Sequence, residues 1–192
     1  PETNIMVLNN TIRNMGDDGI AVAAFGGFIS GDTITNTGAA FYSGFTVAGS
    51  GLAITAFNTT GAMSRNITVS ENRIIRCVGS GVQSDCVNAS SWTEAITVTD
   101  NLIRECNETG IYAVRARRWV VSGNQVYDCD FDNNGSLVGG ILLDNAKIME
   151  VIGNIVCDTR DTGSRSQDVG ILGLANDGPS FGLLINENTG GT

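Results

Sequence analysis

Two stretches of the chain share one pattern: residues 67–77 read ITVSENRIIRC and residues 96–106 read ITVTDNLIREC. In each, apolar and polar residues alternate up to an asparagine, Asn72 or Asn101, and apolar residues resume after it. Such alternation is typical of a β-strand with one buried face. Asparagine tolerates the left-handed backbone of a sharp bend and can bond its own backbone. The pattern therefore predicts two short strands joined by a bend at the asparagine.

The pattern recurs along the whole chain. An asparagine, once replaced by aspartate, marks each repeat: Asn10, Asp32, Asn72, Asn101, Asn124, Asn154 and Asn188. A Gly–apolar pair that begins a third strand follows at Gly19, Gly44, Gly81, Gly110, Gly140 and Gly170. One repeat cannot bury its inward face alone, so repeats stack into a solenoid with equivalent residues in ladders. We predict an all-β fold, a parallel β-helix of about seven rungs.

The lengths of the repeats differ, and we assign the excess residues to loops around 48–65, 83–95, 130–139 and 158–169. The longest interval, from Asp32 to Asn72, is interpreted as one rung with a long loop, because no second Gly–apolar strand fits it. Residues 1–192 are expected to form a single domain. Since the chain begins at Pro1, we expect it to be a piece of a longer protein.

Composition excludes several classes of function. The net charge is −9 at pH 7, and no basic stripe is present to neutralise phosphates, which argues against nucleic acid and an anionic membrane surface as partners. The apolar segments are too short for a transmembrane helix. The sequence contains no histidine, so catalysis would have to use Asp, Glu, Tyr, Arg or Lys. Three cysteines, Cys77, Cys106 and Cys129, share one ladder position and are predicted to pack in the core.

The repeat, with its asparagine bend, trailing cysteine and Gly–Ile strand, resembles the right-handed parallel β-helix repeat of the pectin-lyase-like superfamily over essentially the whole chain. The resemblance implies a right-handed, single-stranded solenoid. The superfamily includes pectate lyases, polygalacturonases, alginate epimerases, and phage tailspikes that bind or depolymerise bacterial surface glycans. The resemblance is specific for the fold and weak for function.

One segment resembles a catalytic motif. Residues 16–22 read GDDGIAV and are similar to the polygalacturonase segment GDDCIAI, whose paired aspartates carry out inverting hydrolysis. The resemblance implies Asp17 and Asp18 as catalytic carboxylates. However, Ser43 is placed where that family has a histidine, its RIK motif has no counterpart, and its earlier aspartate would precede Pro1. The alternative is that Gly-Asp-Asp-Gly forms an ordinary turn.

A second set of acids occupies the ladder position four residues after the asparagine. Glu105, Asp128 and Asp158 would lie in successive rungs, roughly 5 Å apart, and like charges this close repel one another. Carboxylates at such separations are also what glycosidases use, so all three are candidate catalytic residues. The alternative is a solvated turn ladder in which Arg76 is a partial partner.

Other residues are candidates for binding. Trp92, in an insertion, and Tyr112, predicted to point outward, are candidates for stacking on sugar rings. Arg115 and Arg117, with Arg118, are suited to gripping an acidic glycan, although they could equally neutralise acidic neighbours.

The segment from Asp130 resembles the opening of a calcium loop. It supplies Asp130, Asp132 and Asn134 as candidate ligands, which Asp128 or Asp144 could complete. The alternative is a polar surface loop, because Ile141 stands where a calcium loop needs its bidentate glutamate. No cofactor is required in this interpretation, and calcium is the one candidate ion.

Together these observations predict a domain that binds and degrades a polysaccharide, like a tailspike or a pectinase, as a glycoside hydrolase or polysaccharide lyase. Its partner would be a bacterial surface glycan or a pectin-like polymer, and its location extracellular or at the virion surface. Assembly as a homotrimer is implied by the resemblance to tailspikes alone. The alternative is a non-catalytic shaft of a virion or an adhesin, without chemistry of its own.

Overall fold

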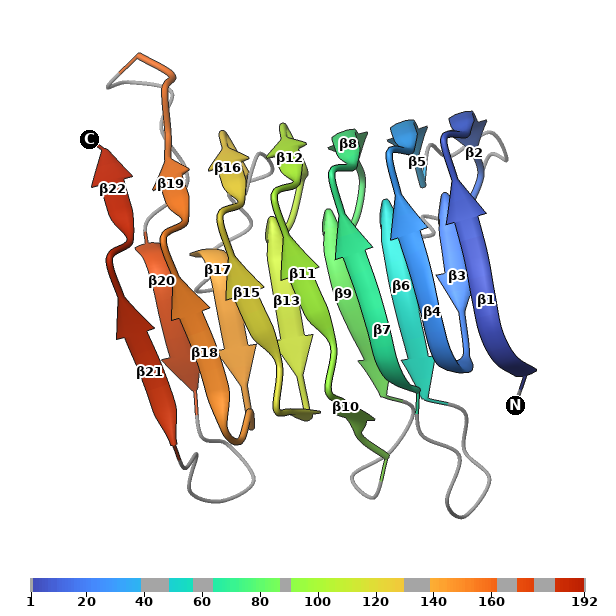
Figure 1. The fold of residues 1–192 in the computed structure, drawn as a ribbon. Coiled ribbons are helices and arrows are strands. Elements are labelled where there is room, and N and C mark those ends of the chain that lie inside the picture. Colours follow the sequence, from blue (N-terminus) through green and yellow to red (C-terminus); the bar gives the residue numbers. More distant parts are fainter. Residues whose placement is uncertain are drawn as a thin grey trace.

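The computed structural model describes residues 2–38, 49–56, 64–86, 91–129, 139–161, 169–174 and 182–191. These residues form short β-strands joined by turns, and the strands stack as successive rungs along one axis (Figure 1). No helix that could cross a membrane occurs within these ranges. The predicted all-β class is confirmed.

The strands form three parallel sheets, named here A, B and C. Sheet A contains β1 (Glu2–Leu8), β4 (Ala24–Ser30), β7 (Arg65–Ser70), β11 (Thr97–Thr99), β15 (Val120–Ser122), β18 (Met149–Ile152) and β21 (Leu183–Asn186), with the short β10 (Thr93–Glu94) and β14 (Ala116–Arg117). Sheet B contains β2 (Thr11–Met15), β5 (Thr33–Thr37), β8 (Arg73–Cys77), β12 (Leu102–Arg104), β16 (Gln125–Tyr127), β19 (Ile155–Cys157) and β22 (Thr189–Gly191). Sheet C contains β3 (Ile20–Val22), β6 (Leu52–Ala56), β9 (Val82–Cys86), β13 (Ile111–Val114), β17 (Gly139–Asp144) and β20 (Val169–Leu174).

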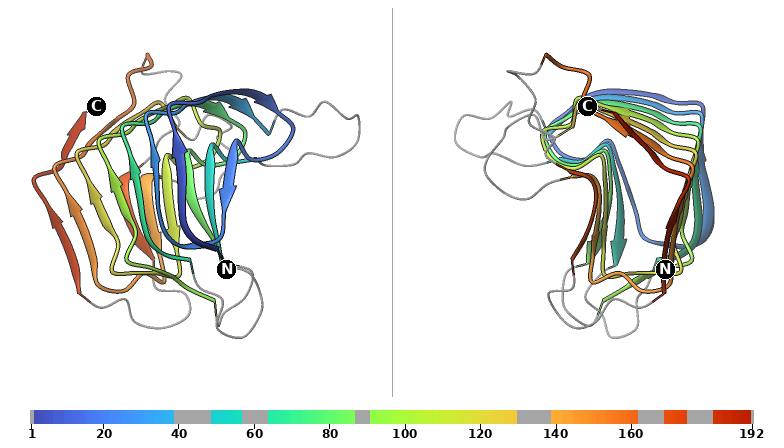
Figure 2. Two further views of the ribbon diagram at one scale, coloured as in Figure 1. Left: turned by 45° about the vertical axis from the view of Figure 1, so that its right-hand side comes forward. Right: turned by 90° about the vertical axis from the view of Figure 1, so that its left-hand side faces the viewer.

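Equivalent residues of neighbouring rungs pair in register. The valine three residues before the asparagine illustrates this: Val69 pairs with Val98, Val98 with Val121, and Val121 with Val151. Sheet B passes through seven strands in sequence order, and the view along the axis shows the three sheets enclosing one core (Figure 2). The prediction of a parallel β-helix of about seven rungs is confirmed.

The second rung differs from the prediction. Ile20 pairs with Leu52, so the third strand of this rung is β6 and follows Gly51, within the segment that was predicted to be a loop. The assignment of this strand to Gly44 was therefore wrong, and Ser50 rather than Ser43 precedes it; Ser43 and Gly44 lie outside the described residues. A side chain at Gly51 would place its Cβ 2.7 Å from the carbonyl oxygen of Gly81, which explains the requirement for glycine.

The asparagines form a continuous hydrogen-bonded ladder. Asn124 is typical: its backbone N–H and its Nδ2 both donate to Asn154 Oδ1, at 3.0 and 2.9 Å. Nδ2 also donates to the carbonyl oxygen of Val98 in the preceding rung. In turn, Asn124 Oδ1 accepts bonds from the N–H and Nδ2 of Asn101. The ladder thus satisfies the buried polar groups of each bend, because every rung supplies acceptors to its neighbour.

Asp32 interrupts the pattern of this ladder. Its Oδ1 accepts bonds from the N–H and Nδ2 of Asn10, at 2.6 and 2.8 Å. Its Oδ2 is buried without a hydrogen-bond partner. In the next rung, the amide nitrogen Nδ2 of Asn72 occupies the equivalent place and donates to the carbonyl oxygen of Ile29 at 2.9 Å. An amide at position 32 would be placed to donate to Val7 in the same way.

We therefore expect Asp32→Asn to stabilise the domain. The substitution keeps the acceptor that Asn10 uses and replaces an unsatisfied oxygen by a donor, so the free energy of unfolding should rise by about 1–2 kcal/mol. Guanidinium denaturation at neutral pH measures this change. An unchanged or lower midpoint would show that Asp32 Oδ2 is already satisfied, for example by water.

Inward residues of the three sheets fill the core. Trp119, predicted to point inward, is fully buried, as are Cys106 and Cys129, and Cys77 is 1% exposed. All five cysteines are free thiols. The prediction that the cysteine ladder packs as core residues is confirmed.

Candidate functional site

The outer face of sheet C carries acidic side chains and a tyrosine. Residues of β9 and β13 alternate between buried and more exposed positions, so Asp85 and Tyr112 project outward. Asp144 ends β17 on the same face, and Asp18 and Glu108 lie in the turns before β3 and β13. These side chains are spread along one face of the solenoid, from the first rung of sheet C at Asp18 to the fifth at Asp144.

Asp18 has the environment of a proton donor. Burial raises its pKa, and the negative charges of Asp17 and Asp85 raise it further, although the backbone hydrogen bond from Ser50 acts against them. The Ser50 N–H donates to Asp18 Oδ1 at 2.7 Å. Asp17 is exposed, and its carbonyl oxygen accepts a bond from the Gly38 N–H. The paired aspartates are thus fixed by turn hydrogen bonds, and the raised pKa lets the Asp18 carboxyl keep its proton to a higher pH than a free aspartate does.

Tyr112 is half-buried on the same face, as predicted from its outward position. Its hydroxyl lies 3.5 Å from Asp144 Oδ2. Burial raises the pKa of Tyr112 and so does the negative charge of Asp144, whereas Arg115 opposes both. Tyr112 and Arg115, both predicted to bind substrate, are therefore brought together beside a carboxylate, and the neutral phenol presents an apolar ring with a polar tip.

The ladder of Glu105 and Asp128 exists, but arginines compensate its charges. Arg76 Nε lies 2.8 Å from Glu105 Oε2. Arg104 bridges the two acids, at 3.3 Å from Glu105 and 3.2 Å from Asp128. Glu105 and Asp128 also have backbone φ angles of 54° and 55°, so each occupies the left-handed bend of its turn. Their arrangement favours a structural role in the turn, although their predicted catalytic role stays a prediction.

Asp158, the third acid of this ladder, is buried beside its own arginine. Arg160 Nε donates to Asp158 Oδ1 at 2.7 Å, and its NH2 contacts the other carboxylate oxygen. The Thr159 hydroxyl and N–H both donate to Asp128 Oδ1. The sequence predicted these acids in successive rungs, but it gave no indication that Arg104 and Arg160 would pair with them.

Trp92 and Arg117 lie against each other at the edge where the chain passes from sheet C to sheet A. The Arg117 guanidinium carbon is 3.6 Å from the centre of the Trp92 ring, and Lys147 Nζ is 4.9 Å from it. Arg118 NH1 lies 3.4 Å from Glu94 Oε1. Trp92, which was predicted to stack on a sugar ring, thus has the side chains of Arg117 and Lys147 over its own ring. These residues form a cationic cluster at the edge of sheet C.

The candidate calcium ligands cannot be placed. Asp130, Asp132 and Asn134 lie outside the described residues, and calcium binding stays a prediction. Among the residues that are described, no group of three or more acidic or cysteine side chains could hold a metal ion.

Residues 1–156 match a protein family described as the right-handed β-helix region. The chain belongs to this family. The predicted right-handed parallel β-helix is thereby confirmed. No curated protein matches this β-helix domain in sequence.

Solved structures share the fold at low identity. The Dettilon tailspike protein is 19% identical with a TM-score of 0.55 over 90% of this β-helix. The enzymatically active domain of bacteriophage CBA120 tailspike protein 2 is 13% identical with a TM-score of 0.52 over 99%. The A-module of an Azotobacter vinelandii mannuronan C-5 epimerase is 12% identical with a TM-score of 0.50 over 99%. The chain spans 36%, 37% and 56% of these three proteins, respectively.

Two acids on the face of sheet C were not predicted. Asp85 and Glu108 were overlooked because neither belongs to a sequence motif. The signal for Asp85 was its outward position three residues after Val82 in an alternating strand. Glu108 lies in a turn, where the sequence carries no comparable signal; in the structure the Ser80 hydroxyl of the preceding rung lies 3.5 Å from Glu108 Oε2.

Proposed function

We propose that this domain binds a polysaccharide along the outer face of sheet C and cleaves its glycosidic bonds with paired carboxylates. The observation that carries the proposal is Asp18, a half-buried carboxyl with a raised pKa beside Asp17 and Asp85. Glycoside hydrolysis needs one protonated and one ionised carboxyl. Different environments of the two carboxyls separate their pKa values and so allow both states at one pH. Solved structures with the same fold include an enzymatically active tailspike domain and a mannuronan epimerase, which supports polysaccharide as the ligand class.

In the proposed reaction, the Asp18 carboxyl donates its proton to the glycosidic oxygen as the bond to the anomeric carbon breaks. The ionised partner, Asp17, takes a proton from the water that attacks this carbon. The products are two shorter chains, one with a new reducing end, and the two carboxyls have exchanged protonation states. Tyr112 is placed on the same face, where its ring can pack on a sugar ring and its hydroxyl can bond a sugar hydroxyl.

Release of reducing ends from a panel of bacterial capsules, O-antigens and pectins tests the proposal. The panel is run with and without calcium, and ultraviolet absorbance of unsaturated products separates a lyase from a hydrolase. Release from at least one polymer is the expected result. A folded domain that releases nothing from any polymer contradicts it.

A non-catalytic shaft is the second candidate. It is favoured by the arginine pairing of Glu105 and Asp158 and by the hydrogen bonds that tie the Asp17–Asp18 turn to its neighbours. Under either function, we propose a location outside the cell or on a virion. Assembly as a homotrimer is a further proposal, which light scattering of the purified protein tests.

A further inference from the structure

The turn between sheets C and A repeats one left-handed residue in every rung. The pairing register aligns seven residues with positive φ in this column: Asn4, Gly26, Asn66, Ala95, Arg118, Ile148 and Gly182. Glycine and asparagine suit this conformation, whereas a β-branched residue is strained in it. Ile148, with a φ of 55°, is the β-branched member of the column. Its side chain is also 56% exposed, so core packing does not explain its presence.

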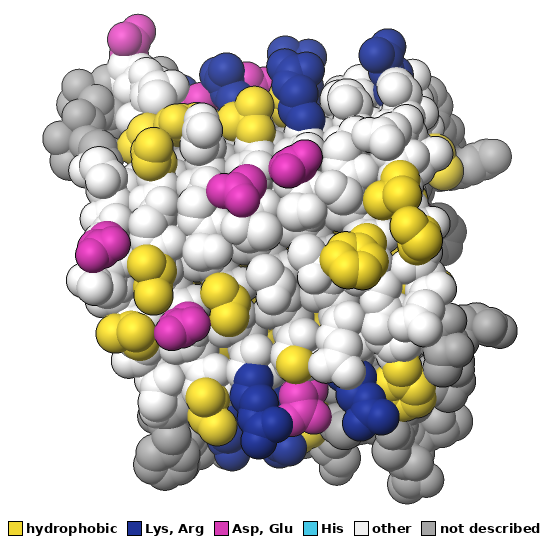
Figure 3. All heavy atoms as spheres, viewed as in Figure 1, with side chains coloured by type: hydrophobic (Ala, Val, Ile, Leu, Met, Phe, Trp, Pro, Cys, Tyr) yellow, Lys and Arg dark blue, Asp and Glu magenta, His cyan; other side chains and the backbone are white. Residues whose placement is uncertain are grey.

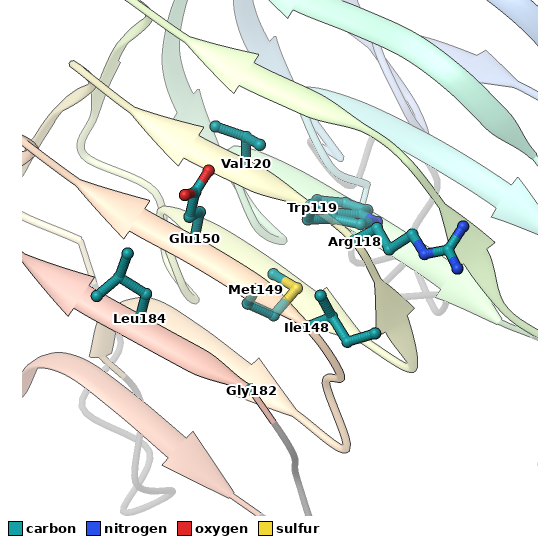
Figure 4. Close-up of a pocket in the computed structure, with 8 residues that line it drawn as sticks. All are labelled: Arg118, Trp119, Val120, Ile148, Met149, Glu150, Gly182 and Leu184. Atoms are coloured by element: carbon teal, nitrogen blue, oxygen red, sulfur yellow. The ribbon is translucent and has the colours of Figure 1, made fainter.

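Ile148 lines a pocket on the outer face of sheet A. The pocket has a volume of about 380 Å³, which is within the range of small-ligand sites. Ile148, Val120 and Leu184 supply apolar surface. Arg118 and Glu150 also line the pocket, and the Arg118 guanidinium extends away from Glu150 (Figure 4). Gly182 lines the pocket on the side of β21. A strained, exposed residue at a pocket is typical of a site kept for binding rather than for stability.

Positive charge is concentrated beside this pocket. The edge between sheets C and A carries five of the chain's 11 lysines and arginines, in a chain of net charge −9: Arg65, Arg115, Arg117, Arg118 and Lys147. Figure 3 shows Lys and Arg side chains along this edge, at the bottom of the view, with an acidic side chain between them; other Lys and Arg side chains lie along the top. Arg117 pairs with Lys147 in register next to the pocket. Aromatic rings rather than carboxylates hold three of these cations, with Arg117 and Lys147 over Trp92 and Arg65 over Phe25.

A cation held over an aromatic ring keeps its charge uncompensated, because the ring contributes no formal negative charge. The guanidinium of Arg117 is fixed in this way, and its Nε has no hydrogen-bond partner. The pocket therefore combines an apolar surface, an arginine and a positive edge, which together favour an anionic ligand with an apolar face.

We propose that this pocket is a second saccharide site that binds a carboxylated sugar unit. The apolar face of the ring would pack on Ile148 and Leu184. The ligand carboxylate would bind the Arg118 guanidinium in place of Glu94, whose Oε1 lies 3.4 Å from Arg118 NH1. Glu150 would accept bonds from sugar hydroxyls. The proposal rests on the proposed function only in taking a polysaccharide as the ligand, because the site lies on sheet A, on a different face from Asp18.

The test is isothermal titration calorimetry with three oligosaccharides. A galacturonate tetrasaccharide and a sialic acid trimer represent the two kinds of carboxylated sugar, and a galactose tetrasaccharide is the neutral control. We expect the wild-type protein to bind at least one acidic probe and not the neutral one. Ile148→Asn should weaken that binding at least ten-fold while raising Tm, since asparagine suits the left-handed turn. Arg118→Gln should weaken the binding as well.

Phe28→Thr and Arg73→Gln are the matched controls. Phe28 is an exposed apolar residue in the same sheet, and Arg73 is an exposed arginine on sheet B. Both variants should bind like the wild type. Binding to neither acidic probe, or equal binding to the neutral one, overturns the inference.

A Tyr112→Ala variant separates the two faces. Binding that persists in Tyr112→Ala and is lost in Ile148→Asn supports the site on sheet A. The reverse result overturns this inference and leaves the proposed function standing. Light scattering tests the alternative that a second copy of the chain occupies the pocket. If Ile148→Asn has a lower mass in solution than the wild type but unchanged oligosaccharide binding, the inference is also overturned.

Discussion

Replacing Asn124 by alanine is expected to lower the free energy of unfolding by about 3–6 kcal/mol, because it removes one complete step of the buried ladder. The change removes the acceptor of the Asn101 N–H, one of the three acceptors of Asn101 Nδ2, and a donor to the carbonyl oxygen of Val98. Each buried polar group left without a partner costs about 1–3 kcal/mol. Since domains are stable by only about 5–15 kcal/mol, this one substitution should bring the protein close to unfolding.

Urea denaturation of Asn124→Ala beside Gln125→Ala measures the effect. Gln125 is the next residue and is exposed, so its substitution should change the free energy of unfolding by less than about 0.5 kcal/mol. Asn124→Asp, which keeps the acceptor and loses the amide donor, should fall between them. Equal midpoints for Asn124→Ala and Gln125→Ala would mean that water replaces the ladder bonds.

The same ladder explains why much of the fold could be predicted from the sequence. A bend that satisfies its backbone through Asn124 and its equivalents favours asparagine at this position, with Asp32 as the one exception, so the requirement is visible as a repeat. Inward positions such as Trp119 follow from their spacing to that asparagine. The third strand has no comparable marker, because its glycine follows a loop of unrestricted length. Gly44 and Gly51 both precede apolar residues, and only the pairing of Ile20 with Leu52 distinguishes them.

The candidate site was predictable in part. Ladder positions placed Glu105 and Asp128 in adjacent rungs, and outward alternation placed Tyr112 on its face. The side-chain partners were not predictable, because Arg104 reaches acids of two rungs and its direction depends on both. Likewise, the contact of Arg117 with Trp92 joins residues of different rungs, and sequence spacing alone could not bring them together.

Asp18→Asn is expected to abolish polysaccharide cleavage while the domain stays folded. Asparagine keeps the oxygen that accepts the Ser50 N–H, so the turn before β3 is preserved. It cannot donate the proton that the leaving oxygen needs, and loss of a general acid lowers rates by about 10²–10⁴-fold. Reducing-end release measures the loss, and the unfolding midpoint should match that of the wild type. Asp128→Asn is the control: it weakens the Arg104 ion pair, so it should lower stability and leave most of the cleavage.

The pH dependence of cleavage tests the same role through the pKa of Asp18. A proton donor acts only while protonated, so the rate should fall as the pH rises through the raised pKa of Asp18. The negative charge of Asp85 contributes to that raised pKa, so Asp85→Asn should lower it and move the fall in rate to lower pH. The two variants are therefore expected to differ. Asp18→Asn removes the activity and with it the pH-dependent fall in rate, whereas Asp85→Asn keeps the activity and moves the fall in rate to lower pH. A wild-type rate that rises with pH in this range would assign Asp18 the role of base or nucleophile instead of acid, since only the ionised carboxylate can act in either way.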